Sequence, residues 1–102
     1  MRISLRYLVT GGAGFIGSAV VRRLIRSTPH CVLVVDKLTY AGNLESLSPV
    51  ASDPRYTFAR ADIVDVQAMR PIVTEFAPDV IMDATITTVV IVSQNGPRTE
   101  PR

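Results

Sequence analysis

Three glycines at three-residue spacing constrain this chain more than any other feature. They belong to the run Gly11-Gly12-Ala13-Gly14-Phe15-Ile16-Gly17, which separates an apolar segment ending at Thr10 from a segment of helical spacing that runs to Arg26. A glycine turn between a strand and a helix is the context in which such glycines bind a pyrophosphate. The alternative is a tight turn that binds nothing.

We expect a different role for each of the three glycines. Gly11 leaves the strand, where a positive φ is expected and a Cβ would clash. Gly14 lets the backbone approach a pyrophosphate closely, so that N–H groups at the helix start can bind it. Gly17 lets the helix pack tightly against the strand.

A second apolar segment ends in an acidic residue. The run Cys31–Asp36 is rich in β-branched residues and typical of a parallel strand buried on both faces. Asp36 lies 19 residues after Gly17 (36 − 17), about where a dinucleotide-binding fold places the acid that accepts hydrogen bonds from the adenosine ribose. Its charge should repel a 2′-phosphate and favour NAD over NADP, and the neighbouring Lys37 offsets part of this preference. The alternative for Asp36 is a solvated strand end.

The rest of the chain alternates strands with helices. Strands are predicted at Leu5–Val9, Cys31–Asp36, Tyr56–Ala61 and Val80–Met82, and helices at Phe15–Arg26, Leu44–Leu47 and Asp65–Phe76. The right-handed crossover rule then gives the strand order 3-2-1-4. We therefore predict an α/β fold, a Rossmann-type parallel sheet with helices on both faces, truncated to about four strands.

Each main helix has a predicted buried face. In the first helix this face comprises Ile16, Val20 and Leu24, with Val21 and Ile25 beside them. In the second helix it comprises Val66, Met69, Val73 and Phe76. Asp65 could cap the second helix. Pro71 either kinks that helix or marks the place where its regular part begins.

Composition excludes several classes of protein. The 102 residues allow one domain, and 47% hydrophobic with 20% charged residues indicates a globular one. A net charge of +2 without a basic stripe argues against nucleic acid as a binding partner. No apolar run approaches the length of a membrane span, so we expect a cytoplasmic protein. Cys31 is expected in the core and His30, the only histidine, at a solvated surface, so no metal site is predicted.

From Leu8 to Met82 the sequence resembles the extended short-chain dehydrogenase/reductase family, and within it the dTDP-glucose 4,6-dehydratases. The runs Val9–Ser18 and Asp36–Leu44 and the pair Asp62-Ile63 carry the resemblance. It implies NAD as the cofactor, with the backbone amides of Phe15 and Ile16 at its pyrophosphate. It also implies that the adenosine is surrounded by Asp36, Lys37, Thr39 and Gly42, with Asp62 and Ile63 beside the adenine ring.

The resemblance fades after Met82. Asp83 stands where the family has a histidine and Ile91 where it has an aspartate, which implies an altered nicotinamide half-site. The family's Tyr-x-x-x-Lys pair has no counterpart, because Lys37 is the only lysine and Leu33 precedes it by four residues. We expect no catalytic residues. Residues 1–83 would be the N-terminal part of an NAD(P)-binding domain, and 84–102 a divergent tail, irregular or an edge strand.

These observations predict a truncated dTDP-glucose 4,6-dehydratase-like protein, from a family that dehydrates nucleotide sugars for deoxysugar and rhamnose biosynthesis. The alternative is a non-catalytic NAD-binding or subunit-interaction module. The strand Val80–Met82 would lie at an open sheet edge, and the uncharged, β-prone segment Ile86–Val92 follows it. We therefore expect self-association through that edge. An antiparallel return that covers the edge is the less favoured alternative.

Overall fold

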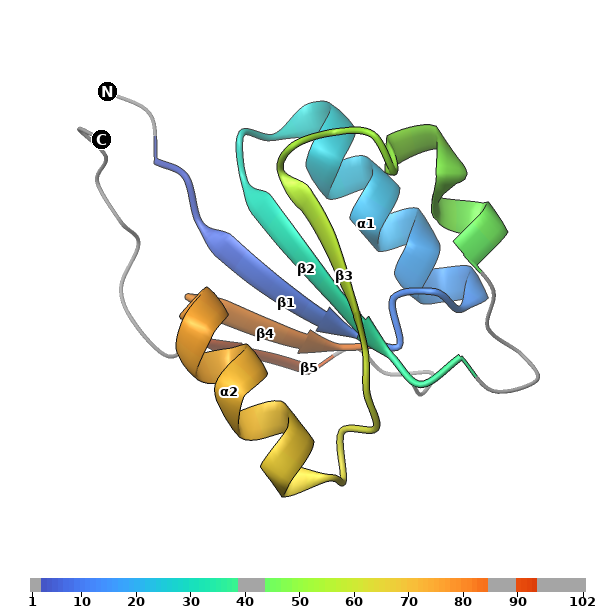
Figure 1. Cartoon of the computed structure of the whole chain (residues 1–102). Helices are drawn as coiled ribbons and strands as arrows, with labels where there is room; N and C mark the ends of the chain where they lie inside the picture. Colours follow the sequence, from blue (N-terminus) through green and yellow to red (C-terminus); the bar gives the residue numbers. More distant parts are fainter. Residues whose placement is uncertain (1–2, 39–43, 85–89, 94–102) are drawn as a thin grey trace.

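Four parallel strands and one antiparallel strand form a single sheet in the order β3-β2-β1-β4-β5 (Figure 1). The computed structural model describes residues 3–38, 44–84 and 90–93. Its elements are β1 Arg6–Thr10, α1 Phe15–Ser27, β2 Cys31–Asp36, the 3₁₀ helix η1 Leu44–Val50, β3 Tyr56–Arg60, α2 Val66–Phe76, β4 Val80–Asp83 and β5 Val90–Ser93. The predicted order 3-2-1-4 is confirmed, with β1 between β2 and β4.

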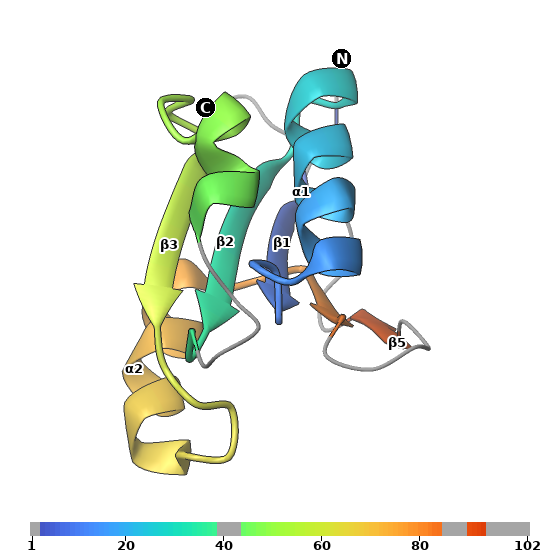
Figure 2. The same ribbon diagram turned by 90° about the vertical axis from the view of Figure 1, so that its right-hand side faces the viewer.

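Helices cover both faces of the sheet, as Figures 1 and 2 show. On one face, Val9, Val32 and Val34 pack with α1 and η1. On the other face, Leu8 and Leu33 pack with the apolar side of α2. Successive strand residues therefore contribute to two different cores, which explains why the strand sequences are apolar throughout.

The buried face of α1 differs from the predicted one. Gly17, Ser18, Val21 and Ile25 are buried, whereas Ile16 is 42% exposed. Leu24 is partly buried and packs against the core. The glycine turn sets the rotation of α1, because Gly17 lies against Gly11 and Gly12 of that turn. The buried stripe is displaced by one position from the predicted one.

The second main helix begins at Val66, five residues before Pro71, and runs through that proline to Phe76. The alternative in which its regular part begins near Pro71 is therefore wrong. Asp65 caps α2 as predicted, because its Oδ1 accepts a hydrogen bond from the Ala68 N–H at 3.2 Å. The residues that pack on the sheet are Met69, Ile72, Val73 and Phe76, while Val66 is 63% exposed.

The predicted open edge at the fourth strand is absent. β5 pairs with β4 in antiparallel register, with Val80 opposite Ser93 and Asp83 opposite Val90. This is the edge-strand alternative, and the short connection between the two strands explains it, because a parallel return needs about a dozen residues. The edge strand on this side of the sheet is therefore β5 and not β4, and self-association stays a prediction.

His30 is not the solvated residue that the sequence predicts. Its Nδ1 accepts a hydrogen bond from the Leu5 N–H at 2.9 Å, and its ring centroid lies 5.2 Å from that of Tyr7. Burial, and then the charge of Arg55, lower the pKa of His30 below its usual 6.5. Cys31, expected in the core, is only half-buried at the start of β2.

Candidate functional site

The glycine turn lies where β1 ends and α1 begins. Gly11 has φ 70°, which confirms the predicted positive φ. Its N–H donates to the Val35 carbonyl at 2.8 Å, and its own carbonyl accepts from the Gly14 N–H at 3.2 Å. These bonds attach the turn to β2 and keep it tight at the carboxyl ends of the strands.

Two glycines of the run are required by close packing. A Cβ on Gly17 would lie 2.3 Å from the Gly11 carbonyl oxygen and 2.8 Å from the Gly12 Cα. The close approach of Gly17 is therefore to the turn and not to the strand, contrary to the prediction. Gly12, which the sequence analysis assigned no role, makes the contact with the strand: a Cβ there would lie 2.7 Å from a methyl carbon of Val34.

Gly14 is different because it has room around it. Among the residues that the structure describes, a Cβ at this position would meet only the Gly11 carbonyl oxygen, at 3.4 Å, which is ordinary van der Waals contact. Gly14 is the N-cap of α1, where no side chain caps the helix and the first turn carries no acidic residue. In the part of the chain that the structure describes, the N–H groups of Phe15 and Ile16 meet no acceptor. Such a helix start attracts anions.

The carboxylate of Asp36 connects the glycine turn to the segment after β2. Its Oδ2 accepts from the Ala13 N–H at 3.0 Å, and its Oδ1 accepts from the Leu38 N–H at 2.8 Å. Leu38 has φ 55°, so the chain turns sharply after the acid. Each carboxylate oxygen has a further lone pair available. The sequence placed Asp36 correctly at the end of β2 but did not indicate that it also supports the turn.

Two more of the predicted residues meet beside Asp36. The Nζ of Lys37 lies 3.6 Å from the Oδ2 of Asp62, and both side chains are partly exposed. Ile63 follows at 40% exposure. The structure thus brings the ends of β2 and β3 together at one edge. Thr39 and Gly42 lie outside the described residues.

A hydrogen-bonded pair occupies the other side of the turn. Thr10 and Asp83 are opposite one another at the ends of β1 and β4. The Thr10 hydroxyl donates to Asp83 Oδ1 at 3.1 Å, and it also lies 3.4 Å from the Met82 carbonyl oxygen. Asp83 therefore lies at the same sheet edge as the glycines.

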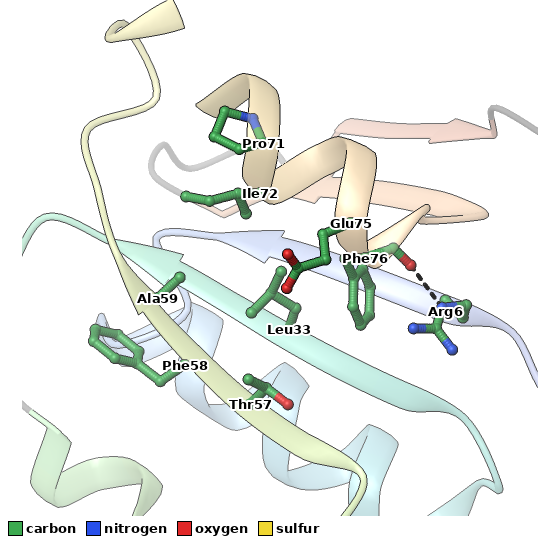
Figure 3. A pocket seen from close by; sticks show the side chains of 9 residues that line it. All are labelled: Arg6, Leu33, Thr57, Phe58, Ala59, Pro71, Ile72, Glu75 and Phe76. Carbon is green, nitrogen blue, oxygen red and sulfur yellow. Dashed lines mark hydrogen bonds between the residues drawn. The ribbon is translucent and has the colours of Figure 1, made fainter. Parts of the chain in front are cut away.

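A groove of about 390 Å³ lies elsewhere, between α2 and the strands. Figure 3 shows Ile72 and Phe76 of α2 facing Leu33 of the sheet across it. At one end Arg6 donates from Nε to the Phe76 carbonyl at 2.7 Å, and Arg6 is the first residue of β1. The groove therefore extends toward the amino ends of the strands and is separate from the glycine turn.

Comparison with known proteins matches residues 7–99 to the NAD dependent epimerase/dehydratase family. The dTDP-glucose 4,6-dehydratase of Neisseria meningitidis is 57% identical over 77 residues, which cover 76% of this chain and 22% of that protein. The dTDP-glucose 4,6-dehydratase 1 of Escherichia coli is 52% identical over 93 residues, covering 91% and 26%. The chain thus spans about a quarter of the length of the curated relatives that it matches.

Solved structures agree with this. The dTDP-glucose 4,6-dehydratase of Bacillus anthracis, in complex with NAD, has a TM-score of 0.77 and 33% identity over 79% of this chain and 26% of that one. The Streptomyces venezuelae enzyme of the same name, with NAD and TYD bound, has a TM-score of 0.74 and 40% identity, covering 82% and 27%. The resemblance, the Rossmann-type fold and NAD as the cofactor of such proteins are confirmed. The individual site residues and the domain boundary stay predictions.

No helix in the described ranges is long and apolar enough to cross a membrane.

Proposed function

The chain belongs to the NAD dependent epimerase/dehydratase family, and from this premise we propose that its carboxyl sheet edge binds the adenosine and pyrophosphate part of NAD. The observation that carries the proposal is the start of α1. There, donors that meet no acceptor in the described residues lie next to Gly14, which has room around it for a ligand.

The residues present fit a pyrophosphate. The N–H groups of Phe15 and Ile16 belong to the first turn of a helix of 13 residues, where the helix dipole favours negative charge. The Phe15 side chain is 92% exposed, so it is not packed over these N–H groups. Asp36 meanwhile holds the Ala13 N–H and fixes the turn, which keeps the donors in place before a ligand arrives.

The residues beside β2 fit an adenosine without a 2′-phosphate. The remaining lone pairs of Asp36 can accept hydrogen bonds from ribose hydroxyls, and its negative charge opposes a phosphate there. Lys37 offsets the negative charge of Asp36 less than its position in the sequence suggests, because its ammonium pairs with Asp62. We therefore expect a preference for NAD over NADP on the order of tenfold, which corresponds to about 1.4 kcal/mol of binding free energy.

For the whole protein we infer a dTDP-glucose 4,6-dehydratase-like role, the dehydration of dTDP-glucose with NAD as the hydride carrier. The high identity to relatives of that name supports it. We propose that these residues serve the cofactor half-site and not proton transfer, and the position of Lys37, the only lysine of the sequence, beside Asp62 supports this. Tyr56 begins β3 at the opposite sheet edge, where burial raises the pKa of its hydroxyl. A non-catalytic NAD-binding module is the alternative, and an assay of dTDP-glucose turnover distinguishes the two.

Calorimetry with NAD, NADP and ADP tests the proposal. The wild-type protein should bind ADP and NAD, and NADP on the order of tenfold more weakly. Asp36→Asn keeps one acceptor oxygen for the two N–H groups, of Ala13 and Leu38, that the carboxylate bonds, and it removes the charge. It should therefore lose most of the discrimination, with a lower melting temperature from the lost second bond. Equal or tighter binding of NADP by the wild-type protein would contradict the role given to Asp36.

A further inference from the structure

In the proposed site, the two halves of a dinucleotide lie on opposite sides of the end of β1. In a parallel sheet of this order, the ligand crosses the sheet edge where the strand order reverses, between β1 and β4. Asp36 at the end of β2 marks the adenosine side of that crossing. The far half of the ligand, which carries the nicotinamide, therefore extends toward the end of β4. Figure 1 shows β1 and β4 side by side and ending at the same edge.

Asp83 is the acidic residue at the end of β4. It is half-buried, and the Thr10 hydroxyl donates to its Oδ1 at 3.1 Å. The Ala84 N–H donates to the Thr10 carbonyl at 2.9 Å, so the backbone on both sides of the carboxylate is paired to β1. Aspartate side chains are ordinarily ionised at neutral pH, and these hydrogen bonds fix where the Asp83 carboxylate lies.

We propose that Asp83 makes this site select the oxidised cofactor, NAD⁺, over NADH. The inference rests on the proposed NAD site. The nicotinamide ring carries a positive charge in NAD⁺ and none in NADH, whereas the adenosine and pyrophosphate are identical in the two forms. A fixed negative charge on the nicotinamide side therefore stabilises one redox form and leaves the contacts of the common half unchanged.

The expected size follows from electrostatics near a protein surface. Two unit charges 4 Å apart interact by about 4 kcal/mol at an effective dielectric constant of 20, and the interaction energy is inversely proportional to their distance. A partly solvated charge several ångströms farther from the ring still gives a ratio of affinities on the order of tenfold.

Dissociation constants for ADP, NAD⁺ and NADH test this, with NADH followed by its own fluorescence and the other two by competition or calorimetry. The wild-type protein should bind NAD⁺ on the order of tenfold more tightly than NADH. In Asp83→Asn, which can still accept from the Thr10 hydroxyl, the ratio should fall toward one while the affinity for ADP stays the same. Glu75→Gln removes an equal charge from exposed α2 surface and should leave the ratio at the wild-type value.

The outcomes separate the two proposals. If the wild-type protein binds ADP but has equal affinities for NAD⁺ and NADH, the role of Asp83 is overturned whatever the variants do, and the proposed NAD site is not. An unchanged ratio in a folded Asp83→Asn variant also overturns it. Absence of ADP binding overturns the proposed function, and this inference with it.

Discussion

At the amino ends of the strands, several side chains form hydrogen bonds to distant backbone groups, whereas at the carboxyl ends the backbone donors at the start of α1 remain unpaired in the described residues. His30 accepts from the Leu5 N–H, and Asp79 accepts from the Arg6 N–H at 2.9 Å. The Arg55 guanidinium donates to the carbonyls of Ile25 and Thr28, at the end of α1. In contrast, the start of α1 has no capping side chain.

The difference indicates a division of roles along the strands. Unpaired polar groups cost free energy when a fold excludes water from them, so they are retained where a ligand or water can satisfy them. The amino edge stabilises the fold, and the carboxyl edge is available for binding. Substitutions at the two edges should therefore affect stability and ligand affinity independently.

The largest effect is expected inside the glycine turn. Gly17→Ala would place a Cβ 2.3 Å from the Gly11 carbonyl oxygen, and neither atom can rotate away, because the backbone fixes the positions of both. The free energy of unfolding should fall by about 2–3 kcal/mol, the cost of overpacking. Urea unfolding measures this, and a variant as stable as the wild type would show that the turn is looser than described.

Gly14→Ser is the matched substitution on the same turn. Its Cβ has room, and its hydroxyl can cap α1, so stability should be unchanged or rise by a few tenths of a kcal/mol. The affinity for ADP should fall, because the hydroxyl takes up the donors that would bind phosphate. Full ADP affinity in Gly14→Ser would show that the uncapped start of α1 does not bind the ligand.

The next largest effect is expected at the amino edge. Arg55→Met removes the hydrogen bonds to the Ile25 and Thr28 carbonyls, and bonds to a charged group contribute about 1.5–3 kcal/mol. We expect a loss of about 2 kcal/mol in unfolding free energy and no change in ADP affinity. Arg55→Lys, which keeps the charge but not the planar fork, should recover part of the loss. Weaker ADP binding in folded Arg55→Met would mean that the edges are coupled.

A smaller effect is expected at the start of α2, which is capped where α1 is not. Asp65→Ala removes the bond to the Ala68 N–H and should cost about 1 kcal/mol, whereas Asp65→Ser should preserve most of the stability. Chemical unfolding of the two variants side by side gives the comparison. Equal stability of Ala and Ser at this position would argue that the cap contributes nothing.

The smallest effect is a pH dependence at His30. Its pKa is lower in the folded state than the unfolded value of 6.5, so the unfolded chain binds the proton more readily. Its contribution to stability is complete above pH 6.5 and declines as the pH falls through 6.5 toward the folded pKa. His30→Asn, whose amide oxygen can accept from the Leu5 N–H without titrating, should flatten the melting temperature between pH 7 and 5. An identical slope in both proteins would assign the dependence to other groups.

The parts of the fold that follow from local pattern were predictable. Glycine spacing, the apolar run before Asp36 and the crossover rule together gave the strand order and the position of the candidate site. The side-chain partners were not predictable, because they depend on contacts distant in sequence: His30 with Leu5, Asp36 with Ala13, and Gly12 with Val34.

Pairing at the fourth strand also required the structure. The segment after Asp83 has the composition of a strand, but composition does not determine whether such a strand pairs within the chain or with another molecule. The displaced face of α1 has a similar origin, since the clearances around Gly17, and not hydrophobic periodicity, set the rotation of the helix.

If ligand binding is confined to the carboxyl edge, an ADP titration followed by backbone amide NMR will locate it there. We expect saturable shifts at Gly12–Gly17 and Asp36–Leu38, with the amides of Leu5, His30 and Arg55 unmoved. Shifts centred on the amino edge or on the groove under α2, or no saturable shift at any concentration, would contradict the account.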